Sequence, residues 1–332
     1  MNGFQDIVGH EKTIAHLRSA IALNRVSHAY LLTGDTGIGK KTIARAFAQV
    51  LLCEDKKAVA SGNACGKCAS CIQAMSGNHP DIITWTHEKP KTFSVDDVRD
   101  LAADVAIRPF TGSRKVYLIP DAQLMNAQAQ NALLKTLEEP PEYAVMILMA
   151  TSADAMLDTV RSRCTTLDLK PVPGSQLHEY LIEKAGVSIH EADVCEAFAQ
   201  GNIGRALSLA SSEEFGEVLE TAIHILSNIR QWELSEIVHA VKELVPHKLT
   251  IDDLLDLFTV WYRDVLFFKA TRDADGIVFT DHLVAIRKAA SESSYEGIEA
   301  IIRAIERAKE RLHANVSFEL AMELLLLTMK EN

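Results

Sequence analysis

The chain has 332 residues, of which 48% are hydrophobic and 24% are charged, a composition typical of a soluble protein with two or three domains. Its formal net charge of −11 argues against a surface that binds nucleic acid over its whole extent, although a local basic patch remains compatible with it. The start of the chain lacks the pattern of a signal peptide and no apolar run is long enough to span a bilayer, so we expect a cytoplasmic protein without membrane contact.

Predicted strands and helices alternate over the first half of the chain. Strands are predicted at residues 29–32, 81–85, 116–119, 145–150 and 165–169. Helices are predicted at residues 11–23, 40–52, 94–107, 126–139 and 154–162. This alternation predicts an α/β core, a parallel sheet covered by helices on both faces, with ligands at the carboxyl ends of the strands.

The turn between the first strand and the helix at 40–52 reads Gly34-Asp35-Thr36-Gly37-Ile38-Gly39-Lys40-Lys41-Thr42. A strand that leads through a Gly-rich turn into a helix directs backbone N–H groups at one point, where the phosphates of a nucleotide can bind. The full pattern asks for Ser or Thr directly after the lysine, because that hydroxyl ligates magnesium. We interpret the segment as an altered nucleotide loop for ATP or ADP, formed by Gly34, Gly37, Gly39, Lys40, Lys41 and Thr42.

Four of the six cysteines follow the helix at 40–52: Cys53, Cys65, Cys68 and Cys71. In a reducing compartment, thiolates at this spacing are metal ligands more often than disulfide partners. Four sulfurs suit tetrahedral Zn²⁺ without an open position, so we predict a structural zinc knuckle over residues 53–71, with a metal-free or redox cluster as the alternative. Cys164 and Cys195 lie in apolar surroundings and are expected to be buried packing residues.

Beyond residue 173 the pattern becomes helical. Three short helices are predicted at 176–185, 190–200 and 205–210, and longer ones at 213–229, 233–245, 251–271, 281–291, 294–313 and 317–330. An apolar stripe in the last of these is typical of a bundle core or a subunit contact: Leu320, Leu324, Leu325 and Leu327. A small helical unit and a helical bundle are therefore expected.

Two further motifs, Asn131–Pro141 and Ser162-Arg163-Cys164, complete a resemblance. Together with the loop at 34–42 and the four cysteines they closely resemble the bacterial DNA polymerase III clamp-loader subunits, over the whole chain. The resemblance implies an AAA+ core at 1–170, a three-helix lid at 171–211 and an all-helical collar at 212–332 that joins subunits into a ring-like heteropentamer. The implied partners are gamma/tau motor subunits and the delta subunit, with the sliding clamp reached indirectly and primer–template DNA weakly or through the complex.

The family has an ATP-hydrolysing gamma/tau motor branch and a delta-prime branch, and several positions bear on the choice. In the motors the strand corresponding to 116–119 ends in Asp-Glu, which serves magnesium and the attacking water. Here Pro120 and Asp121 follow it, and we expect Asp121 to cap the next helix. The motors' Gly-x-x-Arg pattern ends here in Gly204, with Arg205 one place late and turned by about 100° on a helix. With Lys41 replacing the hydroxyl, hydrolysis by this chain is not expected.

Arg163 is the arginine of the Ser-Arg-Cys motif, and this position does not depart from the pattern of the resembling family. The resemblance implies that it enters the nucleotide site of a neighbouring subunit as a finger that stabilises transition-state charge, and the alternative is an ion pair with a local carboxylate. We therefore expect a non-motor delta-prime-type subunit of the DNA polymerase III holoenzyme that supports sliding-clamp loading in replication. A gamma/tau-type ATPase and, from a different class, a zinc-dependent nucleic-acid-binding module are the alternatives, and the acidic charge disfavours the second.

Other charged positions are left open by the sequence. Arg108, Arg114 and Lys115 form a basic patch around Phe110 that fits a solvated loop or a phosphate contact. Thr151 matches a phosphate-sensing position of the motors and is expected to be structural here. The segment 10–12 resembles the family's adenine-side segment or is plain surface charge.

Overall fold

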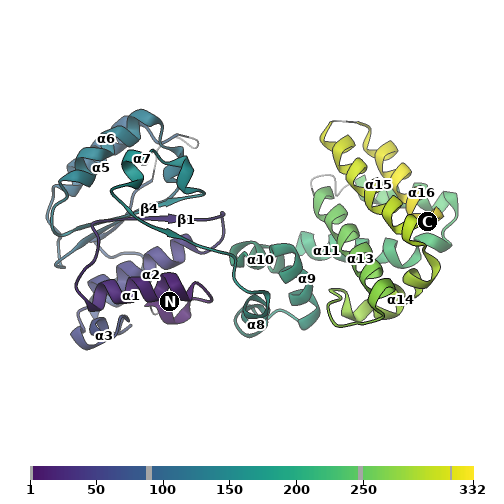
Figure 1. Ribbon diagram of the computed structural model, residues 1–332, viewed down its shortest axis with the longest axis horizontal. Helices are drawn as coiled ribbons and strands as arrows, with labels where there is room; N and C mark the ends of the chain where they lie inside the picture. Colours follow the sequence, from purple (N-terminus) through teal and green to yellow (C-terminus); the bar gives the residue numbers. More distant parts are fainter. Residues whose placement is uncertain (1–2, 87–91, 246–249, 315) are drawn as a thin grey trace. The chain divides into compact units, whose positions relative to one another are not determined.

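The computed structural model describes residues 3–86, 92–245, 250–314 and 316–332 (Figure 1). The chain divides into two compact units, the first made of the residues up to Leu177 together with Gly201–Arg205, and the second of His178–Gln200 and Ala206–Asn332. The three-part division with boundaries at 170 and 211 stays a prediction. We call Gly201–Arg205 the lid segment, and it belongs to the first unit.

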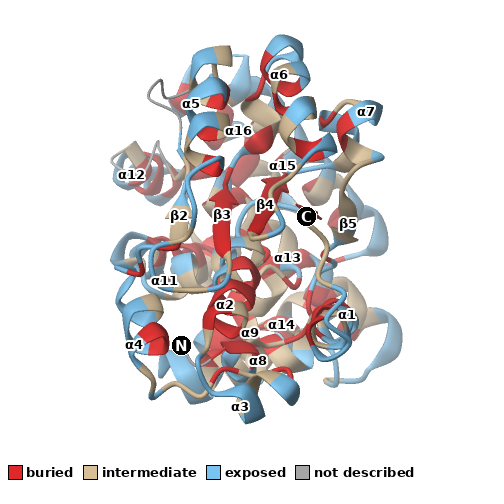
Figure 2. Cartoon of the chain, turned by 90° about the vertical axis from the view of Figure 1, so that its left-hand side faces the viewer, coloured by how far each residue is buried: buried red, intermediate tan, exposed pale blue. Residues whose placement is uncertain are grey.

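The first unit is built on a five-stranded parallel sheet with the strand order β2-β3-β4-β1-β5. Its strands are β1 (Ala29–Thr33), β2 (Ile82–Thr84), β3 (Lys115–Ile119), β4 (Ala144–Ala150) and β5 (Thr165–Asp168). Every residue of β1, β3 and β4 is buried, and Figure 2 shows this in β3 and β4. The predicted α/β core is confirmed, with each strand end within one residue of its expected place, because strands buried on both faces are continuous apolar runs.

Helices cover both faces of this sheet (Figure 1). Helices α1 (Glu11–Ala22) and α2 (Lys40–Leu52) pack on one face, where Phe47 and Tyr30 share a core, while α5 (Val95–Val105) and α6 (Ala127–Glu138) pack on the other, around Leu133. Shorter elements connect them: η1 (Gly3–Asp6), α3 (Lys56–Ala60), α4 (Ala69–Ser76), η2 (Ala122–Leu124), η3 (Ala153–Ala155) and α7 (Asp158–Arg161).

The helix expected over residues 154–162 is wrong. The segment forms η3 and then α7, with extended backbone at Met156 and Leu157 between them. The Met156 side chain is buried, and the Leu157 N–H donates to Gln130 Oε1 at 2.7 Å instead of to a helical carbonyl. Tertiary packing on α6 therefore overrides the local helical preference.

The described residues that follow β5 are helical apart from turns. The first three helices are α8 (Gly174–Ala185), α9 (Ile189–Ala199) and α10 (Ile203–Ala210). The others are α11 (Glu213–Asn228), η4 (Ile229–Gln231), α12 (Leu234–Leu244), α13 (Ile251–Thr271), η6 (Thr280–His282), α14 (Leu283–Glu292), α15 (Tyr295–His313) and α16 (Phe318–Glu331). The predicted helical region is confirmed, although α10 begins two residues earlier than expected.

In the second unit the apolar stripe of α16 divides. Leu325 is buried in the bundle, whereas Leu320 and Leu324 remain 50% and 42% exposed. Of the helices in the described ranges, none combines the length and the apolar character that crossing a bilayer requires.

Candidate functional site: phosphate loop, cysteine cluster and Arg163

The Gly-rich loop at residues 34–42, here called the phosphate loop, lies at the carboxyl end of β1 and opens α2. Gly34, Gly37 and Gly39 have φ values of 136°, 88° and 109°, in a region that side chains rarely adopt. The Gly34 N–H donates to the Thr151 carbonyl at 3.2 Å, and His10 Nε2 bonds the Ile38 carbonyl at 2.9 Å. The predicted turn is therefore present, and its backbone atoms bond the Thr151 carbonyl and the His10 side chain.

Lys40 folds back onto its own loop. Its Nζ donates to the carbonyl of Asp35 at 2.8 Å and also to the carbonyl of Gly34. Burial lowers the pKa of the Lys40 ammonium below its ordinary value, although the charges of Asp121 and Asp35 act in the opposite direction. Two of the lysine's donors are thus used by loop oxygens.

The lid segment is bonded directly to the phosphate loop. Asn202 Nδ2 donates to the Thr36 carbonyl at 2.8 Å, and the Gly204 N–H donates to the Gly37 carbonyl at 3.0 Å. A Cβ atom at Gly204 would lie 2.7 Å from Gly37 Cα, and one at Gly37 would lie 2.6 Å from Asn202 Oδ1. A side chain at either glycine would collide with the opposite segment.

The glycine at position 204 has a structural consequence. Its missing side chain allows the lid segment to lie against Gly37. Asn202 also accepts the Arg205 N–H at 3.0 Å, so its amide joins the start of α10 to the loop. No signal in the sequence pairs Asn202 with Thr36, because 166 positions separate them.

The expectation that Asp121 caps the following helix is wrong. Asp121 has a left-handed backbone with φ of 53°, and its side chain makes no capping bond to η2. Its carboxylate accepts a 3.4 Å bond from Gln123 Nε2. A capping side chain needs an extended backbone to reach the N–H groups of the first turn. Asn126 has that backbone and caps α6, accepting the Ala129 N–H at 2.8 Å.

The four predicted cysteines come together: the Sγ atoms of Cys53, Cys65, Cys68 and Cys71 all lie within 4.8 Å of one another. Cys65 Sγ accepts the N–H groups of Lys67 at 3.4 Å and Cys68 at 3.3 Å, and these bonds lower the pKa of Cys65 to about 7. Cys68 Sγ likewise accepts the Cys71 N–H at 3.4 Å, at the start of α4. Sulfurs held this way by turn N–H groups can bind one metal ion as thiolates.

Of the remaining two cysteines, Cys195 is buried as predicted. Cys164 is only partly buried and packs against the core that includes residues of α6. Burial raises the pKa of Cys164 to about 12 and that of Cys195 to about 11, so neither is a reactive thiolate.

Arg163 lies just after α7, and its side chain is 36% exposed. Its Nη2 is 2.7 Å from Glu138 Oε1, at the end of α6, and its Nη1 donates to the Thr159 carbonyl at 2.8 Å. The local ion pair considered for Arg163 is therefore present, and the guanidinium still reaches the surface. Arg161 instead pairs with Asp154 at 2.8 Å and Asp158 at 3.4 Å, within its own segment.

The basic patch expected around Phe110 is wrong for Lys115. Lys115 is 5% exposed, its Nζ lies 2.9 Å from Asp104 Oδ2, and it also donates to two carbonyls at the end of α5. Its charge is therefore balanced by Asp104 inside the protein and does not contribute to a surface patch. Phe110 is 85% exposed, on a loop whose N–H groups bond the buried carboxylate of Asp81.

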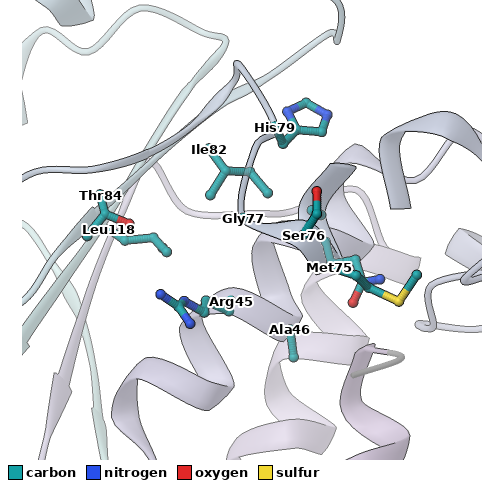
Figure 3. A pocket seen from close by; sticks show the side chains of 11 residues that line it. Arg45, Ala46, Met75, Ser76, Gly77, His79, Ile82, Thr84 and Leu118 are labelled. Atoms are coloured by element: carbon teal, nitrogen blue, oxygen red, sulfur yellow. The ribbon is translucent and has the colours of Figure 1, made fainter. Parts of the chain in front are cut away.

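A separate hollow of about 310 Å³ lies between α2, α4 and the ends of β2 and β3. Arg45, Met75, His79 and Thr84 are among its lining residues, and the Arg45 guanidinium points toward Thr84 and Leu118 (Figure 3). It shares no lining residue with the phosphate loop, the four cysteines or Arg163. We therefore assign it no part in the site.

Comparison with known proteins decides the family. A model described as DNA polymerase III, delta subunit, matches residues 9–173, and one described as its C-terminal part matches residues 218–331. The DNA polymerase III subunit delta' of Bacillus subtilis is 30% identical over 320 residues, which cover 95% of this chain and 94% of that protein. The chain belongs to the DNA polymerase III clamp-loader family.

Two other relatives are also subunits of DNA polymerase III. The delta' subunit of Pseudomonas aeruginosa is 29% identical and covers 90% of each chain. The tau subunit of B. subtilis is 27% identical over 96% of this chain, which spans 60% of that longer protein. Among solved structures, a gamma-subunit-related protein from Thermotoga maritima is 18% identical, with a TM-score of 0.47 over 96% of this chain and 98% of that one.

Proposed function

We propose that this chain is a non-motor, delta-prime-type subunit of the DNA polymerase III clamp loader. It lends Arg163 to the nucleotide site of an adjacent ATPase subunit while that complex loads the sliding clamp onto primed DNA. One observation carries the proposal: the chain's own phosphate loop is bonded to its own lid segment, whereas Arg163 reaches the surface. The delta' subunits among the relatives support the same assignment.

The phosphate loop lacks the groups that hydrolysis requires. A motor site needs a hydroxyl and a carboxylate for Mg²⁺ and a second carboxylate for the attacking water. This chain offers Lys41, Pro120 and Asp121 at those positions, and Asp121 has a left-handed backbone. The Gly204 N–H also bonds the Gly37 carbonyl at 3.0 Å, so the lid segment lies against the loop. The loop therefore acts as part of the scaffold.

Arg163 has the properties of a group that acts on another subunit. A guanidinium offers planar, paired N–H donors that match phosphate oxygens and keeps its charge at any physiological pH. Its pair with Glu138 is half exposed, and exposed ion pairs contribute about 0–1 kcal/mol. The donors of Arg163 that its local partners do not use can contact a neighbour's phosphates, and its charge then offsets the negative charge of the transition state.

The four cysteines are proposed to hold structural Zn²⁺. With Zn–S bonds of about 2.3 Å, tetrahedral geometry requires sulfurs about 3.8 Å apart, and Cys65 Sγ and Cys71 Sγ are 3.9 Å apart. Four thiolates leave no open position, so the ion would fix α4 to the end of α2 and do no chemistry. Metal analysis is expected to give about one zinc per chain, and none after Cys68 and Cys71 are replaced by serine.

The helices after residue 212 are proposed to join the chain to gamma/tau motor and delta subunits in a heteropentamer. The exposed Leu320 and Leu324 of α16 are apolar groups suited to such a contact. DNA and the sliding clamp would be reached through the complex, in the cytoplasm.

The proposal is tested with Arg163→Ala in a complex reconstituted with motor subunits and primed DNA. Hydrolysis at the adjacent site is expected to fall at least about tenfold, in line with the role of arginine fingers in other nucleotide hydrolases, while assembly is unchanged. Arg161→Ala is the matched control, because that residue lies two positions away and pairs within its own segment. Unchanged hydrolysis with Arg163→Ala would contradict the proposal.

A gamma/tau-type motor is the second candidate, because the three loop glycines keep the φ values of a phosphate-binding turn. Steady ATP turnover by the purified chain, abolished by Lys40→Ala, would establish it. We expect no turnover.

A further inference from the structure

We propose that Glu138 is the positioning residue of the finger: it holds the Arg163 guanidinium in the orientation in which a neighbouring subunit receives it. The inference rests on the proposed function of Arg163 and adds a second residue to that site. Its starting point is the 2.7 Å contact between Glu138 Oε1 and Arg163 Nη2, which joins two separate elements, the end of α6 and the turn after α7.

The two elements that carry this pair are fixed relative to each other. Leu137, directly before Glu138, is 1% exposed, and Val160 on α7 is fully buried in the same core. Gln130 on α6 is itself buried, accepts the Leu157 N–H at 2.7 Å and donates to the Met125 carbonyl at 3.0 Å. A buried glutamine therefore sets the start of α7 against α6, and the distance between Glu138 and Arg163 follows from rigid parts.

The guanidinium is anchored at one end and available at the other. Nη1 donates to the Thr159 carbonyl at 2.8 Å and to the Ser162 hydroxyl at 3.3 Å, while Nη2 contacts Glu138. Among the described residues these contacts account for three of the five N–H donors of an arginine. Two donors remain, enough for a bidentate contact with phosphate oxygens.

The ion pair between Glu138 and Arg163 matters for the orientation of the guanidinium more than for stability. An exposed ion pair adds about 0–1 kcal/mol to stability, too little to explain a carboxylate here as a structural element. A long side chain without such an anchor samples several rotamers, and misplacing a reacting group by about 1 Å costs up to about 10²-fold in rate. Glu139, the next residue, is exposed and makes no contact with Arg163, which supplies a matched control.

The experiment uses the reconstituted complex. In every motor subunit except the one adjacent to this chain, the lysine of the phosphate loop is substituted, so that only the adjacent site hydrolyses ATP. Glu138→Ala is expected to lower kcat at that site about tenfold with KM unchanged, because the charge still arrives but is poorly oriented. Glu138→Gln keeps an acceptor oxygen and is expected to retain most of the activity. Glu139→Ala is expected to match the unmodified chain.

The outcomes separate this inference from the proposed function. If Arg163→Ala depresses hydrolysis and Glu138→Ala does not, Glu138 has no positioning role and only this inference fails. If neither variant changes hydrolysis, the finger itself is absent. A rise in kcat with Glu138→Ala and Glu138→Gln alike would show that Glu138 restrains Arg163, which also overturns the inference.

Discussion

The phosphate loop and the turn that carries Arg163 belong to the same α/β unit, but they differ in how far their polar groups are bonded within the chain. The loop gives Thr36 and Gly37 carbonyls to the lid segment, and two of its other carbonyls to Lys40. The Arg163 turn anchors its guanidinium with three contacts and leaves it 36% exposed. The carbonyls of the first region bond groups of the same chain, whereas the guanidinium of the second region still reaches the surface.

The difference shows that a Gly-rich turn can bond a neighbouring segment of its own chain through its carbonyls. Gly34, Gly37 and Gly39 have the positive φ values of a phosphate-binding turn, and the lid segment lies against Gly37. Glycine at position 204 has no side chain, so the Gly204 N–H can reach the Gly37 carbonyl.

The largest effect is expected at that contact. Gly204→Ala places a Cβ 2.7 Å from Gly37 Cα and should destabilise the first unit by about 2 kcal/mol, in spite of the better helix propensity of alanine. Gly216→Ala is the matched control, because this helical glycine has open space around it and should gain about 1 kcal/mol. Urea denaturation measures both. If both variants changed the free energy of unfolding equally, the contact between the lid segment and the phosphate loop would not contribute to stability.

A smaller effect is expected for Asn202→Ala. This change removes the bond to Thr36 and the bond that caps α10, with an expected loss of about 1–2 kcal/mol. Hydrogen exchange of the Arg205 amide should rise along with it. If stability fell while the Arg205 amide remained protected from exchange, its bond to Asn202 would not be what caps α10.

The smallest effect concerns pH. Burial lowers the pKa of His10 below its ordinary 6.5, against a backbone bond to Ile38 and the charge of Glu11. The folded chain therefore binds a proton at His10 less readily than the unfolded chain does. Neutral His10 contributes fully to the free energy of unfolding above pH 6.5, and this contribution is lost as the pH falls below 6.5. His10→Gln should therefore reduce the loss of thermal stability between pH 7.5 and 5.5. An unchanged pH profile would exclude His10 as a titrating contact of the loop.

Much of this fold was predictable from the sequence. Strands buried on both faces are short apolar runs, so β1, β3 and β4 stand out, and the spacing of Cys65, Cys68 and Cys71 predicts their meeting. Local patterns failed where distant groups decide. Gln130 breaks the helix expected at 154–162, and a carboxylate and two carbonyls bury Lys115.

The candidate site was predictable only in part, for the same reason. The residues of the phosphate loop and Arg163 are legible as motifs, whereas the closure by Asn202 and Gly204 joins positions far apart in the chain. The sequence likewise allowed a carboxylate partner for Arg163 without indicating that it is Glu138.

We propose that this chain acts on its neighbour's nucleotide and not on its own. The most direct measurement compares Lys40→Ala and Arg163→Ala in the same reconstituted complex, by ATP hydrolysis with primed DNA and the sliding clamp. We expect Lys40→Ala to leave hydrolysis unchanged and Arg163→Ala to lower it at least about tenfold at the adjacent site. Loss of hydrolysis with Lys40→Ala and none with Arg163→Ala would contradict this proposal.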